Sequence, residues 1–304
     1  MPHRDTPLYP VRLGGQYGYI DSRGMLVIDY QYTEAFEFAE GLACVRTEGR
    51  CGYINATGRM AIPPQFDWAE AFSEQFAAVK LGEKWGFVDA KGSMAIVPQF
   101  SRALPFSDGL AQVKLGGRWG YVDSTGDVKV AVIWDETLPF TEKRAPVRRG
   151  ADWGYIDENG KIVLQRRFVS AMGFADKLAR VWIDGKWGYI DTSGQLAIEP
   201  GFPWAYDFSE GLAAVWNGKQ TGFIDSTGQF IIEPQFEWAL RFSGGLAAVK
   251  RRGRWGFIDT KGTMVIEPQF AKTFDFRGPL ALVGDDHQLF YIDRTGKAVW
   301  NPYA

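Results

Sequence analysis

Acidic side chains recur along this chain of 304 residues at a spacing that could build repeated cation sites. They stand 34 residues apart, at Asp21, Asn55, Asp89, Asp123, Asp157, Asp191, Asp225, Asp259 and Asp293. A ring of carboxylates could hold metal ions, but an Asp side chain also bonds its own backbone at the start of a turn. Asn55 fills one position without any other change in the pattern. We therefore interpret the series as turn residues and expect no metal and no cofactor.

Tryptophan recurs with the same period, usually directly before a glycine. These glycines are Gly18, Gly52, Gly86, Gly120, Gly154, Gly188, Gly222 and Gly256. The Trp side chains could stack on ligands. However, a catalytic or binding motif normally occurs once, whereas a feature that recurs at a fixed spacing is usually architecture. We therefore interpret the Trp series as core between structural units.

Positions that vary within this regular frame are better candidates for function, because the fold does not dictate them. The first such group is basic and comprises Lys143, Arg144, Arg148, Arg149, Arg166, Arg167 and Arg180. Positions 34 residues apart lie close together on adjacent units, so these side chains could merge into one patch that binds an acidic protein surface. The alternative is an ordinary solvated face.

The second variable group is aromatic. Trp68, Trp204 and Trp238 occupy one position in the link between units, which elsewhere carries Glu34, Arg102, Glu136, Ser170 or Lys272. A position that accepts both charge and Trp is expected to be at least partly exposed, and exposed Trp marks interaction surfaces. Partial core packing is the alternative. We predict Arg144, Arg148, Arg149, Arg166, Arg167, Trp68, Trp204 and Trp238 as partner-binding residues.

Catalytic chemistry finds little support in the residue types. The only histidines are His3 and His287, and no set of nucleophile, base and acid can be assembled. We therefore expect no catalytic residues and no enzymatic activity. The two cysteines, Cys44 and Cys51, flank a short turn and are expected to face each other across two strands as free thiols, with a redox role as the alternative.

The repeated residues indicate short strands and turns. "YIDTSGQLAI" is expected to form two strands joined by a turn, with Asp at its start and Gly at its end. "LAAVWNGKQTGFID" is expected to form a hairpin around Asn217-Gly218. Each repeat is therefore predicted to be a three-stranded antiparallel meander, with about eleven residues linking it to the next. The link could hold a helical turn.

Neighbouring meanders are expected to stack face to face. In "LAAV" both sides of the strand are apolar, and a small meander cannot bury two faces alone. The predicted fold class is all-β, with tandem 34-residue repeats that form an open superhelical or propeller-like array.

Composition excludes several broad classes. The chain is 46% hydrophobic and 15% aromatic, which indicates a folded protein. Its formal net charge of −2 gives no general attraction to nucleic acid or to anionic membranes. The start, "MPHRDTPLYP", has no apolar run like that of a signal peptide, and no run is long enough for a membrane helix. We expect a cytoplasmic protein.

In the order of its motifs the chain resembles the WG-repeat family, also called KWG repeats, of bacterial proteins. Trp-Gly, Asp-x-x-Gly, Pro-x-Phe and Gly-Leu-Ala-x-Val recur in one fixed order from about Val11 to Pro302. We therefore expect residues 1–304 to form a single WG-repeat array of eight full repeats and a partial ninth. The resemblance implies a binding or interaction module without general enzymatic activity.

We expect a monomeric, non-enzymatic scaffold that binds another protein. One version is a bacterial immunity (antitoxin-like) protein that caps a toxin. The alternative is a carbohydrate or cell-wall glycan-binding module that stacks sugars on exposed Trp. Neither nucleic acid nor a membrane is an expected partner.

Overall fold

The computed structural model describes residues 7–302, and of residues 165–167 only the backbone. The described residues form β-strands joined by turns, and no helix that could cross a membrane is found among them. The strands form separate antiparallel sheets, here called blades 1 to 9. Within each blade the hydrogen-bonded neighbours follow the order of the chain.

Two compact units divide the chain. The first extends to Gly150 and includes Tyr155–Val163, and the second comprises Ala151–Gly154 and the residues from Leu164 onward. The boundary passes through blade 5, whose strands are β16 (Glu136–Thr137), β17 (Ala145–Arg149), β18 (Asp152–Ile156) and β19 (Ile162–Phe168).

Blades 1 to 4 belong to the first unit. Blade 1 has β1 (Tyr9–Leu13), β2 (Gln16–Ile20) and β3 (Leu26–Tyr32). Blade 2 has β4 (Glu34–Ala39), β5 (Leu42–Thr47), β6 (Arg50–Asn55) and β7 (Met60–Phe66). Blade 3 has β8 (Trp68–Ala69), β9 (Phe76–Leu81), β10 (Lys84–Asp89) and β11 (Met94–Phe100). Blade 4 has β12 (Arg102–Ser107), β13 (Leu110–Leu115), β14 (Arg118–Val122) and β15 (Val128–Trp134).

Blades 6 to 9 belong to the second unit. Blade 6 has β20 (Ser170–Ala171), β21 (Leu178–Ile183), β22 (Lys186–Asp191) and β23 (Leu196–Phe202). Blade 7 has β24 (Trp204–Ala205), β25 (Ala213–Trp216), β26 (Thr221–Ile224) and β27 (Phe230–Phe236). Blade 8 has β28 (Trp238–Ser243), β29 (Leu246–Arg251), β30 (Arg254–Asp259) and β31 (Met264–Phe270). Blade 9 has β32 (Lys272–Thr273), β33 (Ala281–Gly284), β34 (Leu289–Ile292) and β35 (Ala298–Trp300).

The prediction of three-stranded meanders was wrong for blades 2 to 9, because the link forms an additional strand. In "EWALRFSGG" of blade 8, Trp238 pairs with Lys250, and Ala239 pairs with Val249. The link is extended and not helical, and its polar backbone groups pair with the edge of "LAAV" that the meander alone would leave open. The resulting four-stranded blade is the building unit of β-propellers and not of a superhelix of three-stranded meanders.

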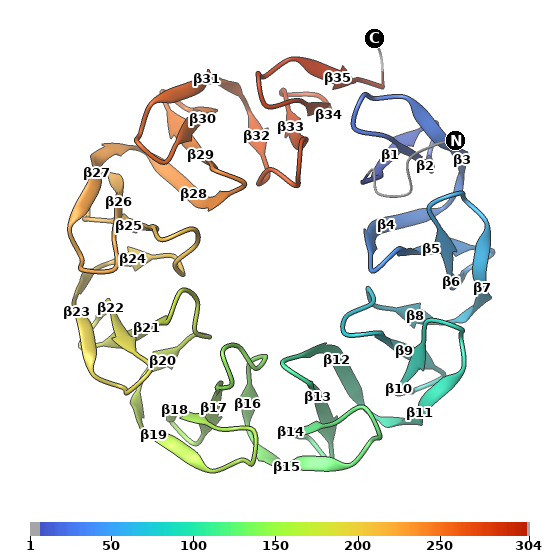
Figure 1. The fold of residues 1–304 in the computed structure, drawn as a ribbon, viewed down its shortest axis with the longest axis horizontal. Coiled ribbons are helices and arrows are strands. Elements are labelled where there is room, and N and C mark those ends of the chain that lie inside the picture. Colours follow the sequence, from blue (N-terminus) through green and yellow to red (C-terminus); the bar gives the residue numbers. More distant parts are fainter. Residues whose placement is uncertain (1–6, 303–304) are drawn as a thin grey trace. The chain divides into compact units, whose positions relative to one another are not determined.

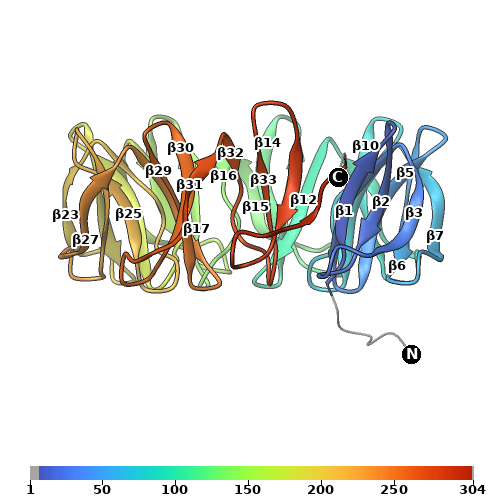
Figure 2. The same cartoon turned by 90° about the horizontal axis from the view of Figure 1, so that it is seen from above.

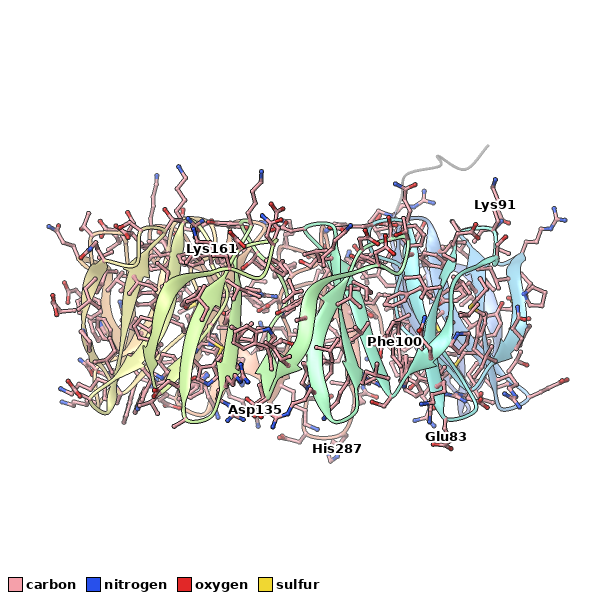
Figure 3. The ribbon with its side chains drawn as sticks, turned by 90° about the horizontal axis from the view of Figure 1, so that it is seen from below. Glu83, Lys91, Phe100, Asp135, Lys161 and His287 are labelled. Carbon is pink, nitrogen blue, oxygen red and sulfur yellow. The ribbon has the colours of Figure 1, made fainter. Side chains whose placement is uncertain are left out.

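Within each unit the blades stack in chain order. In the first unit, β4, β8 and β12 lie on one side of the stack, and β7, β11 and β15 lie on the other (Figure 1). The strands run between two opposite sets of turns (Figure 2). Lys91 and Lys161, at the Asp-x-x-Gly turns, project from one face, whereas Glu83 and Asp135 lie on the opposite face (Figure 3). We call these the Asp-turn face and the hairpin face.

The core lies between blades, and each blade contributes both of its sides, as the alternation in "LAAV" predicted. In β29, Ala247 and Val249 pack into one cluster with blade 7. Leu246 and Ala248 of the same strand pack into a second cluster with blade 9. All four side chains are buried. Blade 8 therefore shares an apolar core with each of its two neighbours.

The glycine of the Trp-Gly pair is required because the backbone of the paired strand in the same blade bulges against it, as β7 does at Gly52. A Cβ atom at Gly52 would lie 2.6 Å from the carbonyl oxygen of Ile62 and 2.8 Å from the nitrogen of Pro64. The glycine at the end of the Asp turn has a different role. Gly58 has a φ of +78°, and its Cβ position lies 3.2 Å from Ile28 of the preceding blade. Both glycines therefore serve the frame.

Candidate binding surface

The Trp series belongs to the core, as predicted. Trp85, Trp153 and Trp187 are buried. Trp119 and Trp255 are half-buried, and each lies under the ammonium group of a lysine, Lys114 or Lys250. This series therefore holds neighbouring strands together.

The first residue of each link strand forms a row that differs between the units. We call it the first-strand row: Glu34, Trp68, Arg102, Glu136, Ser170, Trp204, Trp238 and Lys272. In the first unit most of its members are ion-paired. Glu34 pairs with Arg46 at 2.8 Å, and Glu136 pairs with Arg148 at 2.5 Å. Arg102 lies 3.0 Å from Glu70 of the preceding blade.

Trp68 is also engaged within the first unit. The guanidinium of Arg46 lies 5.3 Å from the centre of its ring, and Phe36 lies edge-on at 6.0 Å. Its indole nitrogen donates a hydrogen bond to Glu70. The first-strand row of this unit is therefore largely satisfied by contacts within the chain.

In the second unit the same row carries an aromatic cluster, which we define as Trp204, Tyr206, Trp216 and Trp238. Trp204 is opposite Trp216 in the strand register, so both side chains lie on one side of the sheet. The ring of Trp204 lies 5.9 Å from that of Trp238 and 6.1 Å from that of Tyr206. Trp204 is 39% exposed, and the other three are half-buried. Two of the three predicted Trp residues are therefore brought together across blades 7 and 8.

Trp216 belongs to this cluster because its usual partner is replaced. In blade 6 the equivalent Trp182 packs edge-on against Trp187, with ring centres 5.2 Å apart. In blade 7 the residue opposite Trp216 is Thr221. Thr221 is buried, and its hydroxyl oxygen has no hydrogen-bond partner in the described part of the chain. This exception to the Trp series was visible in the sequence, but its consequence for Trp216 required the register.

The basic residues are not gathered at one point. Arg144 precedes β17, whereas Arg148 and Arg149 end it, so Arg144 and Arg149 are separated by about 16 Å along the strand. Arg148 is paired with Glu136 as described above. The side chains of Arg166 and Arg167 lie outside the described residues. Binding by these five arginines stays a prediction.

Arg180, a further member of the predicted basic group, is also internally engaged. Its side chain forms an ion pair with Asp207 at 2.6 Å and lies 4.9 Å from the ring centre of Trp187. It links blade 6 to blade 7 through Asp207 and the carbonyl oxygen of Ala205.

The two cysteines are neighbours but not direct partners. Arg46 is opposite Cys51, and Cys44 is opposite Tyr53, so the thiols are diagonal on one side of the sheet. Both are free, buried and joined by a hydrogen bond. That bond, together with burial, raises the pKa of Cys44, and the hydrogen bond from Cys44 lowers the pKa of Cys51. The expectation that they face each other directly was wrong, because the register places them one pair apart.

The repeated aspartates are turn residues, as predicted. Oδ1 of Asp191 accepts hydrogen bonds from the backbone nitrogens of Ser193 and Gln195, at 2.8 and 3.0 Å. The Ser193 hydroxyl also donates to this carboxylate and lowers its pKa. Asn55 makes the same pair of backbone bonds, to Thr57 and Arg59. Among residues 7–302 no group of three or more acidic, His or Cys side chains could hold a metal ion.

A second set of carboxylates, missed by the sequence analysis, joins consecutive blades. Glu40 accepts hydrogen bonds from the backbone nitrogens of Glu74 and Gln75, at 2.7 and 2.8 Å. The equivalent acceptors are Glu74, Asp108, Asp176 and Glu210. An acidic residue at 34-residue intervals near the end of six links, from Glu40 to Glu210, was the signal. We call this set the carboxylate ladder.

These observations define a tandem-repeat protein built from blades of the β-propeller type. The family described as "WG containing repeat" matches residues 17–51, 52–85, 85–119, 119–151, 153–187, 187–218, 222–255 and 255–286. The chain therefore belongs to the WG-repeat family. No curated protein matches it in sequence.

Solved structures share the fold at low sequence identity. A crystal structure of a eukaryotic initiation factor is 11% identical, with a TM-score of 0.71, and the match covers 97% of this chain and 95% of that one. Dihydro-heme d1 dehydrogenase NirN, in complex with DHE, is 13% identical, with a TM-score of 0.50 and coverage of 98% and 73%. These likenesses concern the fold and carry no activity or ligand to this chain.

Proposed function

We propose that this protein is a non-enzymatic scaffold that binds another protein through the aromatic cluster of its second unit. The observation that carries the proposal is the contact of Trp204 with Trp238 on the first-strand row. The frame does not require these side chains, because Ser170 and Lys272 occupy the same position in neighbouring blades. A partly exposed group of Trp and Tyr is typical of the centre of a protein interface.

The surrounding frame suits this role. Alanine truncation of central Trp residues typically costs about 2 kcal/mol or more of binding free energy in protein complexes. A standard interface covers about 800 Å² on each partner, so neighbouring turns on the hairpin face would also take part. Stacked blades with shared cores keep the cluster preorganised, which reduces the entropic cost of binding.

One specific version is a cytoplasmic, monomeric immunity protein of a bacterium that caps a toxin. A binder of one repeat type, with its contact residues on a rigid frame, suits the occlusion of another protein's active site. The second candidate is a glycan-binding module, favoured by the same indole rings, because sugar faces stack on Trp.

The test compares the intact chain with the variant Trp204→Ala/Trp238→Ala, and with Trp68→Ala as the matched control in the first unit. Each tagged protein is purified from the native host at moderate salt. We expect one protein to be retained in stoichiometric amount by the intact chain and by Trp68→Ala, but not by the double variant. Circular dichroism confirms that all three are folded.

The outcomes of this test distinguish an immunity protein from a glycan-binding module. If the retained protein is toxic when produced alone and harmless when produced with this chain, the immunity version holds. If all three chains retain the same protein equally, the aromatic cluster is not the contact surface. Binding of a labelled cell-wall oligosaccharide that is lost in the double variant, without any protein partner, would replace the proposal with the glycan module.

A further inference from the structure

We propose that the aromatic cluster docks an acidic segment of the partner, with apolar side chains on the indoles and carboxylates on the adjacent hairpin turns. This inference rests on the proposed function and specifies the chemistry of the partner. It follows from the charges that surround the cluster in blades 7 and 8.

The two hairpin turns next to the cluster carry only basic charge. Trp216 is followed directly by the turn of blade 7, Asn217-Gly218-Lys219-Gln220. Trp238 is opposite Lys250, which is followed by Arg251 and Arg252 in the turn of blade 8. The indoles and the cations therefore come from the same ends of the same two blades.

Most of these cations are not neutralised within the chain. Lys219, Arg251 and Arg252 are exposed, and none of them forms an ion pair with another described residue. Arg251 makes only a long hydrogen bond to Gln235, at 3.4 Å. The fourth turn cation, Arg254, is paired with Asp286 of blade 9 at 2.9 Å.

The equivalent turns of the first unit are different. Arg50 forms an ion pair with Asp67, and Arg118 forms one with Asp135. These aspartates directly precede the first-strand row. After the turns of blades 7 and 8 the corresponding positions hold Glu237, which forms no ion pair with another described residue, and Ala271, which has no charge. Blades 7 and 8 thus carry partly exposed indoles beside cations that have no ion partner. In the turns of blades 2 and 4, by contrast, the cations are ion-paired.

Besides Asp286, the carboxylate of Glu237 lies at this surface and helps to select the partner. Glu237 accepts hydrogen bonds from the backbone nitrogen of Gly253 in the turn of blade 8, at 3.0 and 3.3 Å. Its negative charge lies between Trp238 and Arg252 and would repel phosphate groups. A nucleic acid, whose phosphates form a continuous chain, is therefore a poorer ligand for this surface. A peptide, by contrast, can place carboxylates beside the cations and an apolar residue beside the carboxylate.

The probe is a displayed library of random 12-residue peptides, selected on the purified intact chain. Peptides that also bind the Trp204→Ala/Trp238→Ala chain are removed. We expect the remaining peptides to be net negative and to contain at least one aromatic or large aliphatic residue. A synthetic copy of the most enriched peptide is then measured at low and at moderate salt.

The charge variant is Arg251→Glu/Arg252→Glu, and its matched control is Lys261→Glu/Lys297→Glu on the Asp-turn face. We expect the first to weaken the peptide at least tenfold and the control to leave it within twofold. Affinity should also fall as salt rises, because exposed charges are screened.

Neutral or basic peptides, or affinity that is unchanged in the Arg251→Glu/Arg252→Glu chain, would overturn the inference while the proposed function stands. If no peptide distinguishes the intact chain from the double Trp variant, the aromatic cluster does not bind peptides, and the inference fails. Stronger binding of a labelled single-stranded oligonucleotide than of any selected peptide would also overturn it, in favour of nucleic acid.

Discussion

The first residue of the link strand differs in chemistry between the two units. In the first unit the first-strand row carries Glu34, Arg102 and Glu136, each in an ion pair with another residue of that unit. In the second unit it carries Trp204 and Trp238, whose rings contact each other. Since the strands around both rows follow the same register, the difference lies in the side chains alone. A repeat frame can thus be held constant while one part of it becomes a binding surface.

The largest expected effect is on stability, and it tests whether the two units depend equally on the glycine of the Trp-Gly pair. Gly52→Ala in the first unit and Gly222→Ala in the second should each lower the free energy of unfolding by about 3 kcal/mol. At both positions the added methyl would lie 2.6 Å from a carbonyl oxygen of the neighbouring strand in the same blade. Chemical denaturation measures both variants. Gly201→Ala is the control, because its nearest new contact would be 3.7 Å away. A large loss of stability in only one of these two variants would show that the units are not built alike.

The next effect tests whether the rows differ in function. Trp204→Ala/Trp238→Ala should weaken partner binding by at least about 2 kcal/mol, or roughly thirtyfold. Trp68→Ala should have a much smaller effect, because Arg46 and Phe36 already cover that ring. Titration calorimetry with the isolated partner gives both values. Equal losses would show that the two rows act alike.

A smaller effect concerns two of the exceptions to the Trp series, Thr221 and Cys51. Thr221→Val should raise the free energy of unfolding by about 1 kcal/mol, since it removes a buried hydroxyl that has no partner. Cys51→Val, at the equivalent position of the first unit, should lower stability because it removes the hydrogen bond with Cys44. Thermal unfolding under reducing conditions measures both. If both variants changed stability in the same direction, the predicted difference between Thr221 and Cys51 would be wrong.

The smallest effect is a pH dependence at the Asp turns. The hydrogen bond from Ser193 lowers the pKa of Asp191 in the folded protein, so its stabilising contribution is present above the pKa of the unfolded chain, about 3.9, and is lost as pH falls through the folded value. Asp191→Asn should therefore make unfolding slightly less sensitive to acid. Asn55→Asp should make it slightly more sensitive. Identical acid-unfolding curves for both variants and the parent would rule out this contribution.

Much of the frame could be predicted from the sequence, because repetition separates structural residues from variable ones. The turn at Asp191, its closing glycine Gly194 and the buried Trp187 recur at fixed intervals and were assigned correctly. The link strand was missed, because a segment as short as Trp204–Ala205 has too few residues for an alternating pattern. Its pairing with the next strand is visible only in three dimensions.

The candidate surface was less accessible to sequence reasoning. The link position identified Trp204 and Trp238, but the place of Trp216 beside Trp204 depends on strand register. Arg148 seemed available in the sequence because its partner, Glu136, lies twelve positions earlier on another strand. Charges that cancel across a sheet cannot be recognised by reading along one strand.

The hydrogen bonds of the carboxylate ladder follow the order of the chain. In the bonds described within each unit, the acceptor belongs to the earlier blade and the donating turn to the next one, as for Glu40 with Glu74 in the first unit and Glu210 with Gly244 in the second. During synthesis on the ribosome, the N-terminal blade emerges first. A turn that donates to the ladder therefore meets an acceptor that has already been made, and these bonds can form in the order of translation.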